Sequence, residues 1–221
     1  MKPTSKSDET RVRILTAAMD LFRRKGFEEA TMREIASEAG MATGAAYYYF
    51  DSKDAIILAF YDQAQAEMVP QLEEALARTK DLKERLRALL EIKLHYFEPN
   101  RRLLGALAVH TDPEHSLSPF SSRTRAIRER DVEFFARALE GSKVRLTADL
   151  KPHLPRILWL YQMGLILYWI HDRSAGQKRT HALVDKSLPI IVRLIQVSGF
   201  PLLRPIRKSL VDLVETVTEE A

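Results

Sequence analysis

The chain has 221 residues, of which 46% are hydrophobic and 29% are charged. This length exceeds one domain of about 150 residues and falls short of two, so we expect a small domain joined to a larger one. Its formal net charge is +4, a mild bias toward anionic partners that does not by itself identify nucleic acid. The absence of cysteine excludes disulfides and a thiolate nucleophile, and the polar start MKPTSKSDET lacks the apolar stretch of a secretory signal, so we expect a cytoplasmic protein.

A first helix is predicted over residues 8–25. Acidic side chains open it and basic side chains close it, as the helix dipole favours. Gly26 follows, where a residue that tolerates left-handed backbone can end a helix. Apolar residues recur at helical spacing and form one stripe that we expect to face the core: Ile14, Ala18, Leu21 and Phe22.

The segment from Thr31 to Lys53, TMREIASEAGMATGAAYYYFDSK, predicts two short helices joined by a tight glycine turn. Thr31 and Glu34 form a capping box, in which a hydroxyl and a carboxylate satisfy backbone donors at a helix start. Gly40 is placed to end this helix, and Thr43 is the predicted N-cap of the second. The arrangement is typical of a device that reads DNA, with the second helix in the major groove.

The second helix of this pair has an unusual outer face. Ala46 and Tyr49 are predicted to point back toward the first helix, whereas Ala45, Tyr47 and Tyr48 point away from it. Surface helices normally carry charge on that side. Small side chains, however, let a backbone approach base edges, and tyrosine hydroxyls donate to phosphate oxygens. Residues 1–53 hold nine Lys and Arg against eight Asp and Glu, a net +1, so the motif and not the charge favours DNA. The alternative is a helical hairpin that only packs.

From about Val12 to Phe60 the sequence closely resembles the DNA-binding domain of the tetracycline-repressor (TetR) family. The resemblance rests on the first helix, the Gly26-Phe27 corner, the capped second helix, the G-x-x-Y run and the F-x-S-K exit. The chain departs from the family at Ala46, where larger aliphatic residues are usual. Carried over by position, the base-contacting helix falls on Thr43, Gly44, Ala45, Tyr47, Tyr48 and Tyr49, and phosphate contacts fall on Thr31 and Lys53.

A fourth helix is predicted from a cap at Asp51 or Ser52 to Val69, before Pro70, and it leads from the reading head, residues 1–53, into the body, residues 54–221. No strand pattern occurs, so the chain is expected to be all-α. The TetR resemblance implies an N-terminal three-helix helix-turn-helix DNA-binding domain and a C-terminal helical ligand-binding and dimerisation domain. Further helices are expected over residues 72–78, 81–98, 101–109, 119–141, 154–171 and 177–197, with an apolar repeat at Leu203, Ile206, Leu210, Leu213 and Val217.

The longest apolar run, ILWLYQMGLILYWI over residues 157–170, is too short for the ~20 residues that cross a bilayer, so no membrane partner is expected. It is apolar nearly all round and needs partners on two sides, which favours a homodimer. The alternative is a helix buried wholly within one chain. The residues expected at the dimer interface are Leu158, Leu165, Trp169, Val184, Leu188, Ile191 and Ile195.

Motifs of catalysis are absent: there is no P-loop, G-x-G-x-x-G, G-x-S-x-G or H-E-x-x-H, so neither catalytic residues nor a cofactor are assigned. His110, Asp112, Glu114 and His115 lie close together, but such a polar loop is more often solvated, and no metal is assigned to it. The TetR resemblance implies a pocket for a small-molecule effector. Its candidate lining residues, each of which is also compatible with ordinary core packing, are His95, Tyr96, His110, Trp159, Tyr161, Met163 and Tyr168.

Together these features predict a homodimeric TetR-type regulator of transcription. Two reading helices about 34 Å apart require a near-palindromic double-stranded operator. Repression that a small molecule relieves is the leading interpretation. The alternatives are an activator with the same head, and a helical ligand carrier or protein-interaction scaffold that does not bind DNA.

Overall fold

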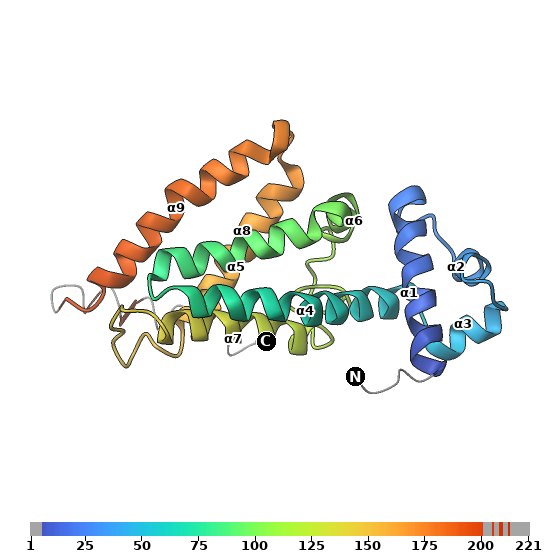
Figure 1. The fold of residues 1–221 in the computed structure, drawn as a ribbon, viewed down its shortest axis with the longest axis horizontal. Helices are drawn as coiled ribbons and strands as arrows, with labels where there is room; N and C mark the ends of the chain where they lie inside the picture. The colour runs from blue at the N-terminus through green and yellow to red at the C-terminus, as the bar shows by residue number, and fades with distance from the viewer. Residues whose placement is uncertain (1–5, 201–204, 206–207, 210–211, 213–221) are drawn as a thin grey trace. The chain divides into compact units, whose positions relative to one another are not determined.

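The computed structural model describes residues 6–200 together with residues 205, 208, 209 and 212. Every regular element among these residues is helical (Figure 1), which confirms the all-α class. The apolar repeat predicted after residue 201 lies outside the described residues. The α-helices are α1 (Lys6–Lys25), α2 (Met32–Glu38), α3 (Thr43–Tyr49), α4 (Lys53–Arg78), α5 (Leu82–Phe97), α6 (Arg101–Leu107), α7 (Arg125–Glu140), α8 (Leu154–His171) and α9 (Lys178–Val197), with 3₁₀ turns η1 (Glu98–Asn100) and η2 (Ala175–Gln177).

The chain divides into two compact units. Unit 1 comprises Met1–Ala66 and Pro99–Thr124, and unit 2 comprises Glu67–Glu98 and Arg125–Ala221. The border therefore falls inside α4, and a segment after α5 returns to unit 1. This return depends on contacts between residues that are far apart in the sequence. The predicted division at residue 53 is based on the order of the helices along the chain and does not include such contacts.

Unit 1 is built around α1, which packs against α2 and α6, while α2 packs against α3. The predicted inner stripe of α1 is buried, and the ring of Phe22 meets that of Phe27 edge-on at 5.2 Å between centroids. Arg23 Nε donates to Asn100 Oδ1 at 2.9 Å, which joins the end of α1 to the start of α6. Ser116 donates to Asp54 and ties the loop after α6 to the first turn of α4.

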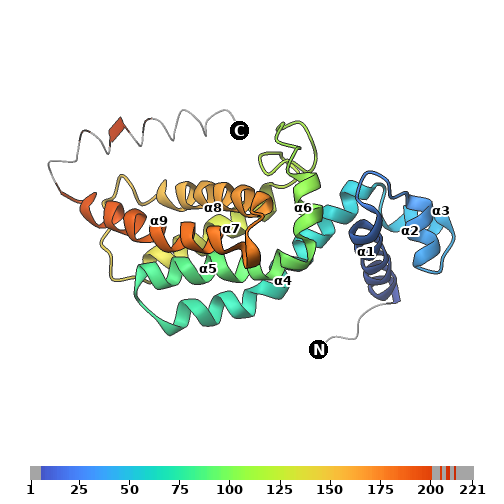
Figure 2. The same ribbon diagram turned by 90° about the horizontal axis from the view of Figure 1, so that it is seen from above.

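Unit 2 is a helical bundle in which α7 packs on α8 and α5, and α9 packs on α5 and α8 (Figure 2). Its core is leucine-rich, with Leu86, Leu90 and Phe135 fully buried. A buried polar bridge crosses this core: Lys93 of α5 pairs with Asp131 of α7, to which Gln162 of α8 also donates at 3.3 Å. The bridge satisfies polar groups that would otherwise be costly in an apolar interior.

Two predicted helix boundaries are wrong by several residues. The fourth helix does not end before Pro70 but continues to Arg78, because Leu72 and Leu76 on its next turns are buried. This packing outweighs the backbone hydrogen bond that proline cannot donate. The seventh helix does not begin at Pro119 but at Arg125, because Thr124 Oγ1 donates to Ser118 O at 2.6 Å and holds the preceding residues in a turn.

The connection between α8 and α9 is organised by Asp172. This carboxylate accepts from the backbone N–H and hydroxyl of Ser174, at 2.9 and 2.7 Å, and from the same groups of Thr180, at 2.9 and 2.8 Å. Burial raises the pKa of Asp172, but the four hydrogen bonds outweigh it and hold the pKa well below its ordinary value. The ionised side chain therefore fixes the start of α9 against the end of α8.

None of the helices within the described residues combines the length and the apolarity that crossing a bilayer requires.

Candidate nucleic-acid interface

The start of α2 is fixed by the predicted capping box. Thr31 has extended backbone, and its Oγ1 accepts from the N–H of Glu34 at 3.3 Å, while Glu34 Oε2 accepts from the N–H of Thr31 at 2.9 Å. Lys25 at the end of α1 donates to the other carboxylate oxygen of Glu34 at 2.6 Å. One glutamate thus joins the first two helices of the unit.

We expect Glu34→Gln to remove an acid-sensitive part of the stability. The hydrogen bond from Lys25, followed by those from Thr31, lowers the pKa of Glu34 from 4.5 to about 2. Because the folded-state pKa is depressed, the carboxylate contributes stability that is present above pH 4.5 and is lost as the pH falls toward 2. Thermal unfolding across this range should therefore show the Tm values of wild type and E34Q converging at acid pH. A constant difference would contradict this assignment.

The turn between α2 and α3 has the geometry of a Schellman motif. Gly40 has a φ of +64°, its N–H donates to Ser37 O at 3.0 Å, and the N–H of Met41 donates to Ala36 O at 3.0 Å. The prediction that Gly40 ends the helix is confirmed. The predicted N-cap at Thr43 is wrong by one residue: Ala42 is the extended cap, and Thr43 is already helical because the chain enters α3 directly from the glycine turn.

The faces of α3 are oriented as the sequence predicted. Ala46 is fully buried, whereas Ala45 is exposed and the side chains of Tyr47 and Tyr48 are 51% and 84% exposed. Tyr49 is half-buried, and its ring meets that of Tyr48 edge-on at 5.2 Å between centroids. This helix carries no charged residue, so its outer surface offers small groups, rings and hydroxyls.

Lys53, at the start of α4, is bonded within unit 1. Its Nζ donates to Phe27 O at 2.6 Å and to Glu28 O at 3.1 Å, and it lies 4.7 Å from the centroid of the Phe27 ring. Two of its three donors therefore hold the turn between α1 and α2 against α4. A phosphate contact through the third donor stays a prediction.

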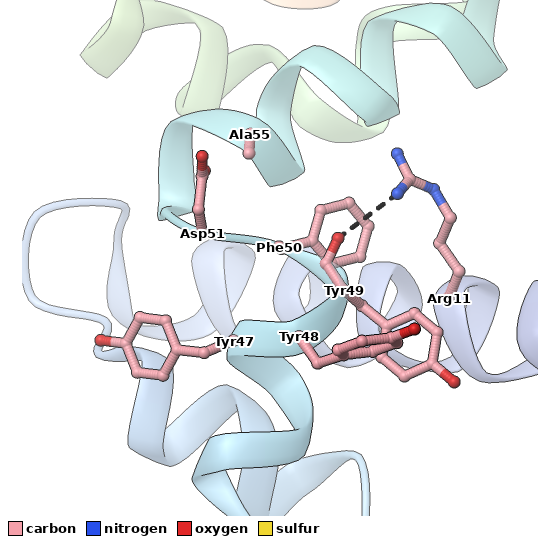
Figure 3. A pocket seen from close by; sticks show the side chains of 7 residues that line it. All are labelled: Arg11, Tyr47, Tyr48, Tyr49, Phe50, Asp51 and Ala55. Carbon is pink, nitrogen blue, oxygen red and sulfur yellow. Dashed lines mark hydrogen bonds between the residues drawn. The ribbon is translucent and has the colours of Figure 1, made fainter.

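A shallow pocket of about 290 Å³ lies beside the C-terminal end of α3 (Figure 3). Arg11 reaches it from α1, with its guanidinium carbon 4.4 Å from the centroid of the Phe50 ring. Sequence reasoning missed Arg11, since its contact with Tyr49 spans 38 positions and no local pattern marks it. The pocket is lined by Arg11, Tyr47, Tyr48, Tyr49, Phe50, Asp51 and Ala55.

Two family models match the chain. Residues 14–60, which include α2 and α3, match the model for bacterial regulatory proteins of the tetR family. Residues 85–217 match the model for the tetracyclin repressor-like C-terminal domain, which spans more than half of the chain. The chain belongs to the TetR family. This is a family of regulators of transcription and not of enzymes.

Curated relatives in the TetR family include the HTH-type transcriptional activator FasR of Mycolicibacterium smegmatis, 35% identical over 64% of this chain and 66% of FasR. The regulator BetI of Brucella anthropi is 29% identical over 52% of this chain and 71% of BetI. The fatty acid metabolism regulator protein of Bacillus subtilis is 27% identical over 38% of this chain. That alignment spans 43% of the relative, and the alignment with FasR spans just under two thirds of FasR.

Solved structures of TetR-family proteins share this fold. A regulator from Nitrosomonas europaea matches with a TM-score of 0.64 at 19% identity, over 83% of this chain and 98% of that one. FadR from Bacillus subtilis, solved in complex with stearoyl-CoA, matches with a TM-score of 0.61 at 15% identity, over 86% of this chain and 98% of FadR. At these identities the likeness concerns the fold alone.

The residues predicted for a TetR-type dimer interface lie on the inner faces of α8 and α9. Leu158, Leu165 and Trp169 of α8 are buried in the subunit's own core, as are Val184, Leu188 and Ile195 of α9, while Ile191 is half-buried. A different face of the two helices is exposed and largely apolar. This outer face is formed by Leu160, Gly164, Leu167 and Tyr168 on α8 and by Leu183, Ile190, Leu194 and Val197 on α9.

The residues predicted to line an effector pocket do not share one environment. Trp159 is buried, Met163 is half-buried, and His95 and Tyr168 are exposed. Tyr96 donates to Glu67, and Tyr161 shares a hydrogen bond with Ser187 of α9. His110 belongs to unit 1 and not to the bundle.

The loop that contains His110 brings two imidazole rings together. The rings of His110 and His115 stack at 3.8 Å between centroids, and His115 Nδ1 accepts from the N–H of Leu117 at 3.1 Å. Asp112 and Glu114 are exposed. Within the described part of the chain, no three histidine, cysteine or acidic side chains gather as metal ligands would.

Proposed function

We propose that this chain regulates transcription by binding a near-palindromic DNA operator through α3, as a homodimer whose operator affinity a small molecule controls. The outer face of α3 carries the DNA part of the proposal. The helix pair α2 and α3, with its capping box and its glycine turn, exposes Ala45, Tyr47 and Tyr48 to solvent, and none of these side chains is charged. Such a surface is poorly explained by solubility and well suited to a major groove.

The experiment is a binding titration against the upstream region of the protein's own gene. Wild type is expected to give a salt-sensitive specific complex. Tyr47→Ala should weaken binding to all sequences on the order of tenfold, because it removes a phosphate donor, whereas Ala45→Ser should mainly change sequence preference. Normal binding by Tyr47→Ala would show that α3 is wrongly assigned. Failure of wild type to bind any DNA would favour the carrier or scaffold alternative.

The homodimer is supported by the exposed apolar outer face of α8 and α9. Self-association through a twofold axis is the simplest way to cover such a face, since each subunit offers the same patch to the other. Paired in this way, the two copies form a four-helix interface. The two copies of α3 then read two half-sites of one operator.

The direction of regulation is the open part of the proposal. FasR, whose alignment covers 64% of this chain, is named as an activator. Activation of transcription by the same DNA-binding head is therefore the second candidate. Position of the operator relative to the promoter separates the two: overlap with the promoter supports repression, and a site upstream of it supports activation.

The effector is proposed to bind unit 2 and to act on operator affinity through linkage, with α4 as the helix that belongs to both units. A relative named as a fatty acid metabolism regulator supports fatty acids and their derivatives as the first class to test. Mass spectrometry of small molecules that co-purify with the protein identifies the class. Addition of that compound should then change operator affinity.

A further inference from the structure

The pocket beside α3 holds an arginine that neither the sequence motif nor the proposed reading helix accounts for. Arg11 of α1 approaches the last turn of α3, where its Nη1 donates to Tyr49 O at 3.4 Å, and its guanidinium lies over the Phe50 ring (Figure 3). These two contacts set the direction of an exposed side chain that would otherwise be free to rotate.

Most of the hydrogen-bonding capacity of Arg11 is unused. A guanidinium has five N–H donors, and the contact with Tyr49 occupies one of them. Among the described residues no other hydrogen-bond or ion-pair partner of Arg11 is present, and its side chain is exposed. The remaining donors form a planar fork, which matches the oxygens of a phosphate.

The electrostatics of the pocket depend on this side chain. The C-terminal end of a helix carries a partial negative charge, and the pocket lies at that end of α3. Asp51, also in its lining, is exposed and ionisable. Arg11 is the single basic group among the described residues that line the pocket. Without it, this rim would repel a passing DNA strand.

We propose that the pocket binds a phosphate of the DNA backbone and that Arg11 is a DNA-contacting residue. The inference rests on the proposed function of α3 and extends it. When the N-terminal residues of a recognition helix meet base edges, its C-terminal end comes out toward the sugar-phosphate backbone. Arg11 then binds the strand at the opposite end of α3 from Thr43, Gly44 and Ala45, beside the predicted contacts Tyr47, Tyr48 and Tyr49.

The test measures the affinity of the full-length protein for a 30-base-pair duplex selected by wild type from a random library, at several KCl concentrations. Arg11→Ala is expected to weaken binding on the order of tenfold and to lower the salt slope by about 2 per dimer, one phosphate contact for each head. Arg13→Ala is the matched control, because Arg13 lies on the same helix, is equally charged and exposed, and does not line the pocket. It should change affinity by less than about threefold, as a screened distant charge does.

A methylphosphonate scan distinguishes contact from a structural effect. Each backbone phosphate of the selected duplex is replaced in turn by a neutral methylphosphonate. One position per half-site should weaken wild type and leave Arg11→Ala unaffected, since the partner of that phosphate is already gone. If every position weakens both proteins equally, or if Arg11→Ala behaves like Arg13→Ala, the inference is overturned while the proposed function stands. If wild type selects no duplex, both fall.

Discussion

We expect Gly141→Ala to lower the free energy of unfolding by about 2 kcal/mol, although the position is exposed. A Cβ at residue 141 would lie 2.2 Å from Nη2 of Arg85, so the guanidinium must move. Arg85 is buried and donates to Leu76 O and Thr79 O near the end of α4, and to Arg137 O and Ala138 O near the end of α7. Displacing it leaves buried carbonyls without donors.

The charge of Arg85 is as important as its hydrogen bonds. Two helices point their C-terminal ends, with their partial negative charge, at one guanidinium. Burial lowers the pKa of Arg85, and the nearby charge of Arg137 lowers it further. The four carbonyls offset part of this cost of burying a charge. Arg85→Met should therefore destabilise by about 3 kcal/mol or more, because it removes all four bonds at once.

Urea unfolding followed by tryptophan fluorescence measures both variants, since both tryptophans, Trp159 and Trp169, are buried in α8 of the same unit. In the Arg85→Met background, Gly141→Ala should lower the free energy of unfolding only slightly, because the guanidinium that the new Cβ would displace is absent. Arg87→Met removes the same charge from a surface ion pair with Asp185 and should cost about 1 kcal/mol or less. Additive effects of Gly141→Ala and Arg85→Met would show that the two residues do not act on each other.

Sequence reasoning succeeded where the determining contacts are local. The capping box connects Thr31 with Glu34, three positions on, and the hydrogen bonds of the Gly40 turn connect residues at the end of a single helix. Helix α8 begins and ends as predicted, at Leu154 and His171. In each case the cap, the glycine or the apolar period is visible in a window of a few residues. The orientation of Tyr47 and Tyr48 follows from the same helical period.

The missed features depend on partners far along the chain. Arg85 meets Ala138 across 53 positions and Arg11 meets Tyr49 across 38, and no spacing rule connects them. The faces of α8 could not be assigned from the sequence for another reason. A helix that is apolar nearly all round offers several equivalent stripes, and only packing decides that Leu158 and Leu165 face the core while Leu160 and Leu167 face out.

We expect Leu194→Asp to convert a dimer into monomers at micromolar concentration, because Leu194 is 62% exposed on the outer apolar stripe of α9. A buried unpaired carboxylate on each side of a twofold interface costs several kcal/mol and repels its symmetry mate. Light scattering coupled to size exclusion measures the molar mass directly. Gln196→Asp, which adds the same charge two residues on and off that stripe, should remain dimeric.

Loss of the dimer should in turn weaken operator binding by at least about 100-fold, because the second head no longer binds at the high effective concentration that the first one provides. Arg11→Ala and Leu194→Asp then differ in kind: the first lowers the salt slope of a dimer, and the second removes the preference for paired half-sites over a single one. A Leu194→Asp protein that stays dimeric would place the interface elsewhere. Leu160, Leu167 and Ile190 would then be exposed without a partner. Few soluble helical proteins leave so large an apolar patch in contact with water.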